Sequence, residues 1–297
     1  MNDEVINIIK IHNLHPIGYQ KNGKVYIIKE KKDSFVIKVN TNNYDIYKYL
    51  MSRNFPCFPE NYSLKNNNYD IYKYIDDFNV SKIQKIEDLI VILALLHKKT
   101  MYIREISLDE IKSIYEELNK KIDETRNYYL KINDIIDQEE FINPSHYLLI
   151  RNISLFYSML NYSKNTLNNW YDKIKSAKSI RVVLLHNNID INHLIINENK
   201  YLISWDKAYF DNPIYDIEMF YHKYYQDIEL IDTLYLYEKN NKLNDLEKNL
   251  LIIRLSIPRI ISFTLNTMDD TIAINNEIIY LQKVMNFIEK TINEKLS

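Results

Sequence analysis

Glycine is the residue that this sequence of 297 amino acids lacks most, because Gly18 and Gly23 are the two that it contains. Loops that hold phosphate groups usually need glycine, since a backbone without Cβ can approach a ligand closely and adopt positive φ. Neither a Walker A loop nor a G-x-G-x-x-G motif is present. The sequence therefore excludes both of these glycine-rich nucleotide-binding loops.

Cysteine, an excess of positive charge and long apolar runs are also missing. The single cysteine, Cys57, excludes an internal disulfide framework and indicates a reducing compartment. The net charge is −2 and no basic cluster stands out, so we expect no nucleic-acid partner. The longest apolar run, Leu89 to Leu96, is too short to cross a bilayer, and the first residues lack the pattern of a signal peptide. We therefore expect a cytoplasmic protein without a membrane partner.

The composition is that of a globular protein. Apolar residues make up 46% of the sequence and charged residues 26%. A chain of this length and composition can bury a core that is large enough to fold without a partner.

The first 76 residues are rich in strand-like runs and contain one clear helix. Asn22-Gly23 is a hairpin signal between such runs. The expected strands include Val25–Glu30, Ser34–Val39, Tyr62–Leu64 and Tyr69–Ile75, the last two around a turn at Asn66–Asn68, and the expected helices are Glu4–Ile11 and Tyr44–Ser52. We therefore expect residues 1–76 to form a small β-rich lobe with an antiparallel sheet.

Residues 77–297 are mainly helical in pattern. Apolar residues at helical spacing occur in Glu87–Lys98, Leu108–Leu130, Asn143–Leu160 and Ser163–Ala177, and again from Ile214 onward. Between Arg181 and Trp205 the pattern returns briefly to strands with a short hairpin. The sequence thus predicts an α+β protein whose second lobe, residues 77–297, is larger and helical.

The segment 184–220 carries the residues with the most chemical content. It reads LLHNNIDINHLIINENKYLISWDKAYFDNPIYDIEMF. Its spacing resembles that of the aminoglycoside phosphotransferase and choline kinase family, in which H-G-D-x-x-x-x-N precedes a β-hairpin, I-D-[FWY]-[ED] and G-x-P-x-x-D-[LI]. His186 matches the family histidine and Asp211–Ile217 matches the closing motif, but Asn188 stands at the catalytic aspartate, and His193 and Ser204 stand at the two metal ligands.

Three further stretches resemble motifs of the same family, in the same order. Phe35–Lys38 resembles the strand whose lysine contacts the nucleotide phosphates, Tyr69–Asp77 the strand and hinge between the lobes, and Leu93–His97 the L-A-x-L-H helix. The segment Leu251–Pro258 resembles a spore-coat branch most closely. The resemblance implies a protein-kinase-like bilobal fold with a small antiparallel β-sheet N-lobe and a larger, mainly helical C-lobe.

The resemblance also implies roles for individual residues. ATP is the implied cofactor, with Lys38 at its phosphates, Asp45 as the nearest acid to that lysine, and Tyr74 at the adenine. His186 is expected to fix the catalytic loop, and Asp216 to accept backbone N–H groups from it.

The substituted positions suit phosphoryl transfer poorly. Asn188 can bind a hydroxyl group but cannot take its proton, and the loss of a general base costs about 10²–10⁴ in rate. Mg²⁺ prefers carboxylate oxygens, whereas His193 offers nitrogen and Ser204 a neutral hydroxyl. We therefore expect Mg²⁺ to bind weakly.

Two acids are alternative candidates for these roles. Asp190 is a candidate base, and Asp206 is a candidate metal ligand that, with His193, favours a softer ion such as Mn²⁺ or Zn²⁺. Each lies two residues from the family position, which on a strand is a shift of about 6–7 Å.

Three interpretations follow from these residues. The first is a catalytically impaired pseudokinase that acts by binding a nucleotide or a protein partner. The second is an active ATP-dependent phosphotransferase that acts on a small hydroxylated substrate through non-standard metal ligands. The third is a structural helical protein whose motif order is accidental.

Overall fold

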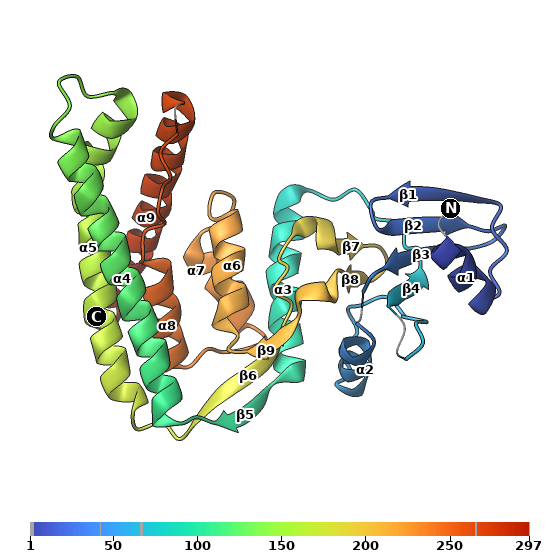
Figure 1. The fold of residues 1–297 in the computed structure, drawn as a ribbon. Helices are drawn as coiled ribbons and strands as arrows, with labels where there is room; N and C mark the ends of the chain where they lie inside the picture. The colour runs from blue at the N-terminus through green and yellow to red at the C-terminus, as the bar shows by residue number, and fades with distance from the viewer. Residues whose placement is uncertain (1–2, 42, 66–67, 265, 297) are drawn as a thin grey trace. The chain divides into compact units, whose positions relative to one another are not determined.

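The structure is a computed structural model that describes residues 3–41, 43–65, 68–264 and 266–296. It contains long helices and small antiparallel sheets (Figure 1), so the predicted α+β class is confirmed. The chain forms two compact units: unit 1 consists of Met1–Met101 and Val183–Asp211, and unit 2 of Tyr102–Val182 and Asn212–Ser297. The division into lobes at residues 76 and 77 stays a prediction.

Unit 1 contains a four-stranded antiparallel sheet in the order β1-β2-β3-β4. The strands are β1 (Gly18–Asn22), β2 (Val25–Lys29), β3 (Ser34–Val39) and β4 (Tyr69–Lys73). Gly23 turns the first hairpin with φ of 59°, a conformation that costs glycine little. Helix α1 (Asp3–Ile11) buries its apolar face in the same cluster as Tyr26 and Ile28 of β2. The predicted hairpin and sheet are thereby confirmed.

The rest of unit 1 contains the predicted helices and hairpin, together with β9 and two 3₁₀ turns that the sequence did not predict. It comprises α2 (Tyr44–Ser52), α3 (Lys82–Thr100), the hairpin β7 (Leu194–Ile196) and β8 (Lys200–Leu202), and β9 (Tyr209–Asp211), with two short 3₁₀ turns, η1 (Ile191–His193) and η2 (Trp205–Lys207). β6 (Ser179–Leu185) starts in unit 2 and pairs with β9 inside unit 1. Together these elements position the predicted catalytic segment.

The predicted strand Tyr62–Leu64 is wrong. The structure has an isolated bridge between Asn61 and Tyr72 there. Asn61 Oδ1 accepts a hydrogen bond from the backbone N–H of Ser63 at 2.7 Å, and Ser63 Oγ accepts one from the backbone N–H of Ile71 at 3.0 Å. These side chains replace the ladder bonds of a strand. Of the turn predicted at Asn66–Asn68, Asn66 and Asn67 lie outside the described residues.

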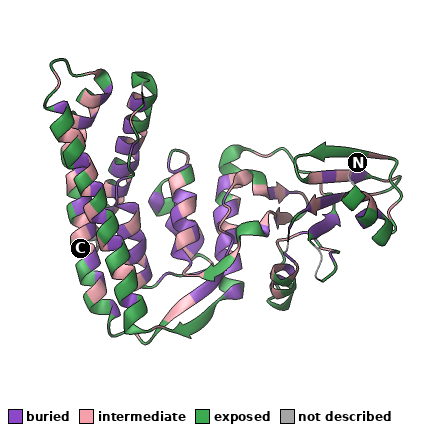
Figure 2. Ribbon diagram, in the orientation of Figure 1, coloured by how far each residue is buried: buried purple, intermediate pink, exposed green. Residues whose placement is uncertain are grey.

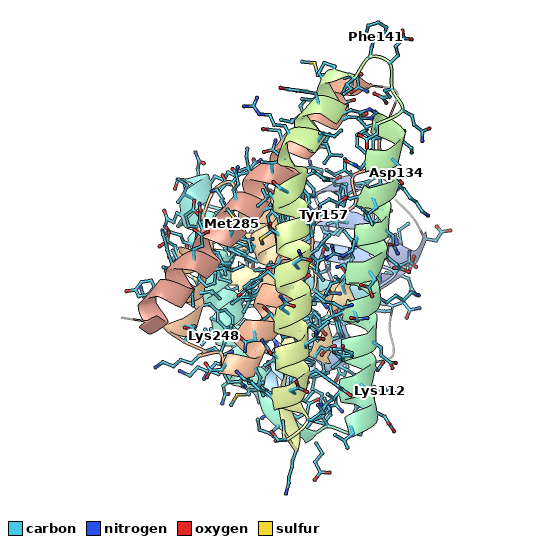
Figure 3. All side chains as sticks on the ribbon, turned by 90° about the vertical axis from the view of Figure 1, so that its left-hand side faces the viewer. Lys112, Asp134, Phe141, Tyr157, Lys248 and Met285 are labelled. Carbon is cyan, nitrogen blue, oxygen red and sulfur yellow. The ribbon has the colours of Figure 1, made fainter. Side chains whose placement is uncertain are left out.

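Unit 2 is mainly helical. Its elements are β5 (Tyr102–Glu105), α4 (Leu108–Ile136), α5 (Pro144–Ile174), α6 (Ile214–Tyr224), α7 (Leu230–Glu238), α8 (Asp245–Leu255) and α9 (Thr267–Leu296). Helix α5 packs against α4, α8 and α9, and Figure 3 shows α4 and α5 side by side, with Asp134 on α4 and Tyr157 on α5. Buried and exposed residues alternate along both helices (Figure 2), as expected for amphipathic helices.

Helix α5 corrects the prediction of separate helices at Asn143–Leu160 and Ser163–Ala177. Ser163, which was predicted to begin the second helix, is buried in the middle of a continuous one. Its hydroxyl donates to the carbonyl of Met159 at 2.9 Å, one turn earlier, so the polar side chain is satisfied without breaking the helix. Within the part of the chain that the structure describes, every helix is too short or too polar to cross a membrane.

A buried ion pair ties the start of α8 to β6 within unit 2. The Arg181 guanidinium donates to both carboxylate oxygens of Glu247, from Nε at 2.8 Å and from Nη2 at 2.5 Å. Glu247 is also the third residue of α8 and accepts from the backbone N–H of Asn244 in a capping box. One carboxylate therefore satisfies a buried cation and caps a helix.

Replacing this carboxylate is expected to destabilise the protein strongly. Glu247→Ala leaves Arg181 buried without its partner, and we expect the free energy of unfolding in urea to fall by about 3 kcal/mol or more. The control is Glu116→Ala, which removes an exposed partner of Lys112 at 3.6 Å and is expected to cost less than about 0.5 kcal/mol. Similar losses in the two variants would contradict this account of the pair.

Candidate functional site

The predicted site residues lie in unit 1, with the exception of Asp216. Lys38, Asp45 and Tyr74 come from its N-terminal part, and the remaining residues come from its second segment, Val183–Asp211. The geometry below therefore belongs to one compact unit.

Lys38 is paired with Asp206. Lys38 projects from β3, and its Nζ donates to Oδ2 of Asp206 in η2, two residues after Ser204. Both side chains are partly buried, with 19% of the lysine and 34% of the aspartate exposed. Asp45 is exposed on the surface of α2. The carboxylate that neutralises the strand lysine thus comes from the segment 184–220 and not from the next helix.

Asn43 and Asp70 extend this pair into a polar cluster, and sequence reasoning missed both. Asn43 Nδ2 donates to Asp70 Oδ2 at 2.8 Å and to Asp206 Oδ1 at 3.2 Å, so one amide group joins two carboxylates. Asn61 Nδ2 donates to the other oxygen of Asp70 at 3.4 Å. Asp70 lies opposite Lys38 in the β3–β4 register and is 2% exposed. An acid within the apolar strand run Tyr69–Ile75 was the signal available in the sequence, because buried acids are rare unless they are paired.

The two carboxylates have opposite pKa shifts. Burial alone would raise the pKa of Asp206, but the hydrogen bond and charge of Lys38 and the bond from Asn43 outweigh it, so the pKa is lowered. Burial raises the pKa of Asp70, because its hydrogen bonds from Asn43, Thr41 and Asn61 are neutral and the negative Asp206 lies near. The positive charge of Lys38 thus lowers the pKa of Asp206, whereas it is not among the causes that shift the pKa of Asp70.

The side chains at the family's catalytic positions contact the backbone of their own segment. Asn188 Nδ2 donates to the carbonyl of Ser204 at 3.1 Å, and a ring nitrogen of His193, Nδ1, lies 2.8 Å from the carbonyl of Asn188. His186 is fully buried, its Nε2 lies 2.9 Å from the carbonyl of Ile203, and its ring packs edge-on against Trp205. These contacts hold the loop and the β7–β8 hairpin together.

Asp190 and Ser204 stand at the start of the two short 3₁₀ turns of this segment. Asp190 Oδ1 accepts a hydrogen bond from the backbone N–H of Asn192 at 2.7 Å and caps η1. Ser204 adopts a left-handed conformation, with φ of 68° and ψ of 54°, which is uncommon for residues other than glycine. This conformation starts the 3₁₀ turn that carries Asp206.

The structure places Tyr74 at the end of β4 and Asp216 at the start of α6. Tyr74 directly follows β4, its backbone N–H donates to the carbonyl of Ser34 at 2.7 Å, and its side chain is 40% exposed. Asp216 is buried in the first turn of α6, in unit 2. The backbone N–H of Ile214 at the start of that helix donates to Asn212 Oδ1 at 3.2 Å.

The donors at the family's metal-binding positions do not fit a magnesium ion. Mg²⁺ requires oxygen ligands, carboxylates above all, but His193 and Ser204 supply an imidazole and a neutral hydroxyl. Among the described residues, no group of three or more histidine, cysteine, aspartate or glutamate side chains is placed to hold a metal ion. The donors at these two positions therefore do not form a magnesium site in the part of the chain that the structure describes.

The ion pair predicts a pH-dependent contribution to stability. Because the folded-state pKa of Asp206 lies below its ordinary value, the stabilisation is present at neutral pH and is lost as the pH falls through the folded-state pKa. At pH 7 we expect Asp206→Asn to lower the free energy of unfolding by about 1 kcal/mol, since the pair is partly exposed. The difference is expected to shrink as the pH falls below 3.8, the ordinary pKa of aspartate, and thermal unfolding at neutral and acidic pH measures it.

The matched control for this pair is Asp45→Asn, on the exposed surface of α2. It removes the same charge and is expected to leave the thermal midpoint unchanged at both pH values. Both variants keep Asp70, but Asp206→Asn removes a negative charge that helps to raise the pKa of Asp70, so this contribution changes in that variant and stays in the control. A loss in Asp45→Asn as large as that in Asp206→Asn would contradict the assignment of the Lys38 partner.

The Asn188 amide is expected to be required as a donor. An aspartate at this position cannot donate to the carbonyl of Ser204 and repels it, so Asn188→Asp is expected to lower the free energy of unfolding by about 1–2 kcal/mol. Asn127→Asp, at an exposed position of α4, is the control and is expected to change it by less than about 0.5 kcal/mol. Urea denaturation distinguishes the two, and an Asn188→Asp variant as stable as the parent would show that the donor is dispensable.

Comparisons with known proteins find the fold and no sequence relative. No protein-family model matches the chain, and no curated protein matches its sequence. A crystal structure of an aminoglycoside phosphotransferase from Alicyclobacillus acidocaldarius is 10% identical, with a TM-score of 0.71 over 95% of this chain and 93% of that chain. An AMP-bound spectinomycin phosphotransferase is 14% identical, with a TM-score of 0.53 over 95% of this chain and 97% of that chain. The chain has the fold of these phosphotransferases, and the predicted kinase-like fold is confirmed.

Proposed function

We propose that this chain is a kinase-like protein that binds a nucleotide and is impaired in phosphoryl transfer. The observation that carries the proposal is the hydrogen bond from Asn188 Nδ2 to the carbonyl of Ser204. The residue at the position of the catalytic aspartate is held as a donor to the backbone. A general base must instead accept the proton of the acceptor hydroxyl.

Lys38 supports the nucleotide-binding part of the proposal. It is a half-buried cation on a strand of the sheet, in the place where the resemblance puts the phosphate-binding lysine. The AMP-bound state of a spectinomycin phosphotransferase with the same fold is consistent with a nucleotide ligand. Within the proposal, the phosphates compete with Asp206 for Lys38, and Tyr74 contacts the adenine.

A second candidate is an active phosphotransferase that acts on a small hydroxylated substrate. The observation that favours it is the partly buried carboxylate of Asp206, which pairs with Lys38 and whose pKa is lowered by this pair. In that case Asp206 supplies the negative oxygen that Ser204 lacks. The first candidate takes precedence because Asn188 and Asp190 are both engaged in local hydrogen bonds.

The proposal includes finer features that rest on the sequence resemblance. The protein acts in the cytoplasm, and its relation to a spore-coat branch makes a protein partner the route by which nucleotide binding is used. Asp216 serves as a scaffold residue that accepts backbone N–H groups from the catalytic loop. The alternative that the motif order is accidental predicts that no nucleotide binds.

Calorimetry with ATP tests the proposal on the full chain. We expect ATP to bind without added metal, Lys38→Ala to weaken binding about tenfold or more through loss of a charge-assisted contact, and ATP turnover to be absent with Mg²⁺ or Mn²⁺. Lys24→Ala, at the end of the turn before β2, is the charge-matched control. It is expected to leave binding unchanged.

Two outcomes would overturn the proposal. Metal-dependent ATP turnover that disappears in Asp206→Ala would establish the second candidate. The absence of any ATP binding, with or without metal, would reject both candidates and leave a scaffolding role.

A further inference from the structure

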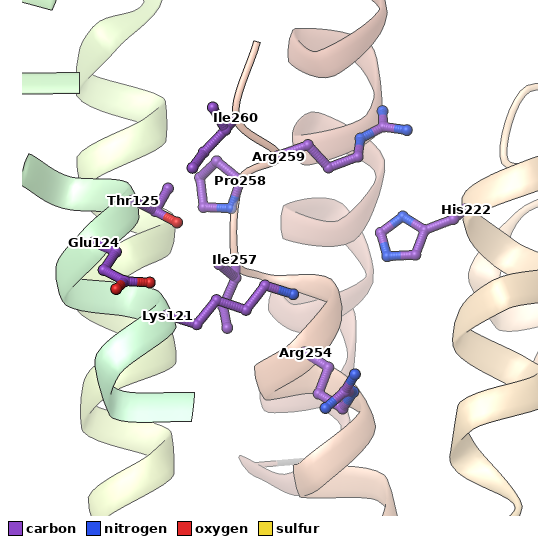
Figure 4. A pocket seen from close by; sticks show the side chains of 9 residues that line it. All are labelled: Lys121, Glu124, Thr125, His222, Arg254, Ile257, Pro258, Arg259 and Ile260. Carbon is purple, nitrogen blue, oxygen red and sulfur yellow. The ribbon is translucent and has the colours of Figure 1, made fainter. Parts of the chain in front are cut away.

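Unit 2 contains a pocket of about 260 Å³ that the proposed function does not use. Residues of α4, α6, the end of α8 and the segment that follows it line this pocket, and Figure 4 labels all of them. They are Lys121, Glu124, Thr125, His222, Arg254, Ile257, Pro258, Arg259 and Ile260. Three permanent cations and one histidine face one carboxylate in this lining, so the wall is predominantly basic.

Two glutamates outside the pocket fix the side chains of Arg254 and Arg259. Arg254 Nε donates to Glu218, and Arg259 Nε donates to Glu277 at 2.6 Å. Neither glutamate lines the pocket, and both are nearly buried. The Arg254 guanidinium also lies over the ring of Tyr215, 4.7 Å from its centroid. Carboxylates and rings therefore fix guanidinium groups that belong to the pocket wall.

Arg254 retains donors beyond these contacts. Its hydrogen bond to Glu218 uses Nε, and its two Nη groups have no hydrogen-bond partner among the described residues. A guanidinium has five N–H donors in a planar fork that matches carboxylate and phosphate oxygens. Arg254 is thus pre-organised to receive an oxyanion.

Lys121 and His222 face each other across the pocket. Figure 4 shows Lys121 reaching in from α4 and His222 from α6, with Arg254 and Arg259 in the space between these two helices. Lys121 has no ion-pair partner within the described residues. The Nε2 of His222 lies 3.7 Å from a carboxylate oxygen of Glu218, and its buried Nδ1 has no hydrogen-bond partner among those residues. The carboxylate in the lining, Glu124, is exposed and lies 3.7 Å from Lys120.

Apart from Thr125, the rest of the lining is apolar. Ile257 and Pro258 are buried, and Ile260 is exposed beside them. The pocket is somewhat smaller than the roughly 300–1,000 Å³ of sites for drug-sized ligands. It therefore suits a small molecule with one charged end and one apolar end.

We propose that this pocket binds a small organic anion, with its phosphate or carboxylate group at Lys121, Arg254 and His222 and its apolar body against Ile257 and Pro258. The site is separate from the nucleotide site proposed at Lys38. It rests on unit 2 alone, so it does not depend on phosphoryl transfer or on ATP binding. Charge-assisted hydrogen bonds to fixed guanidinium and ammonium groups supply its affinity and selectivity.

Titration calorimetry of the full chain with phenyl phosphate, benzoate and inorganic phosphate tests the proposal. The titrations are run at physiological ionic strength, because salt screens the weak attraction of anions to exposed charges on the protein surface. We expect phenyl phosphate or benzoate to bind more tightly than inorganic phosphate, because the latter lacks the apolar body. Whichever of phenyl phosphate and benzoate binds more tightly shows whether the site prefers a phosphate or a carboxylate group. In Lys121→Glu we expect binding to weaken by about tenfold or more.

Lys120→Glu is the matched control, because Lys120 is the neighbouring residue of α4, is exposed and does not line the pocket. It makes the same change of charge and is expected to weaken binding by less than about threefold. Lys121 is exposed and has no ion-pair partner among the described residues, so its variant is expected to keep the thermal midpoint of the parent chain.

Three results would overturn the proposal. The first is the absence of binding of all three anions at millimolar concentration, and the second is equal weakening in the two charge reversals. The third is loss of phenyl phosphate binding in Lys38→Ala, which would place the anion in unit 1. If Lys38→Ala no longer binds ATP but still binds phenyl phosphate, the result supports the nucleotide site at Lys38 and the separate pocket in unit 2.

Discussion

The pairing of Lys38 with Asp206 determines most of the properties of the candidate site. Lys38 pairs with Asp206, while the buried Asp70 has neutral donors, among them the amide of Asn43 that it shares with Asp206. A carboxylate away from water is stable when a cation or several donors neutralise it. The arrangement thus keeps Asp206 charged and leaves Asp70 with a raised pKa. Any ligand that binds Lys38 must compete with Asp206.

The sequence did not reveal that Asp206 pairs with Lys38. A shift of two residues along a strand moves a side chain by about 6–7 Å, and on that basis Asp206 was considered only as a displaced candidate metal ligand. The chain after Ser204 is instead a 3₁₀ turn, which rises about 2 Å per residue. The left-handed conformation of Ser204 that begins this turn leaves no periodic signal. Asp206 therefore reaches Lys38 from a turn whose geometry the sequence does not reveal.

Much of the fold could be predicted, because local patterns determine it. The hairpin at Asn22-Gly23 and the helix Tyr44–Ser52 follow directly from turn chemistry and apolar spacing, and both occur in the structure as predicted. The strand predicted at Tyr62–Leu64 failed because Asn61 and Ser63 bond the backbone with their side chains. Pairings between distant residues, such as Asn43 with Asp70, depend on the tertiary structure and leave no mark on local composition.

The buried acids of the chain separate into two kinds, and the difference bears on function. Glu218, Glu247 and Glu277 each pair with an arginine, so their charges are satisfied permanently. Asp70 has amide donors and lies beside Asp206, which is paired with Lys38. Under the proposed function, phosphate groups that bind Lys38 remove the cation of Asp206, and the free energy of that loss reduces the affinity for the nucleotide. An active kinase recovers this cost with metal ions between its carboxylates and the phosphates. Under the proposed function, His193 and Ser204 supply no such carboxylates, and the same deficit would weaken both nucleotide affinity and catalysis.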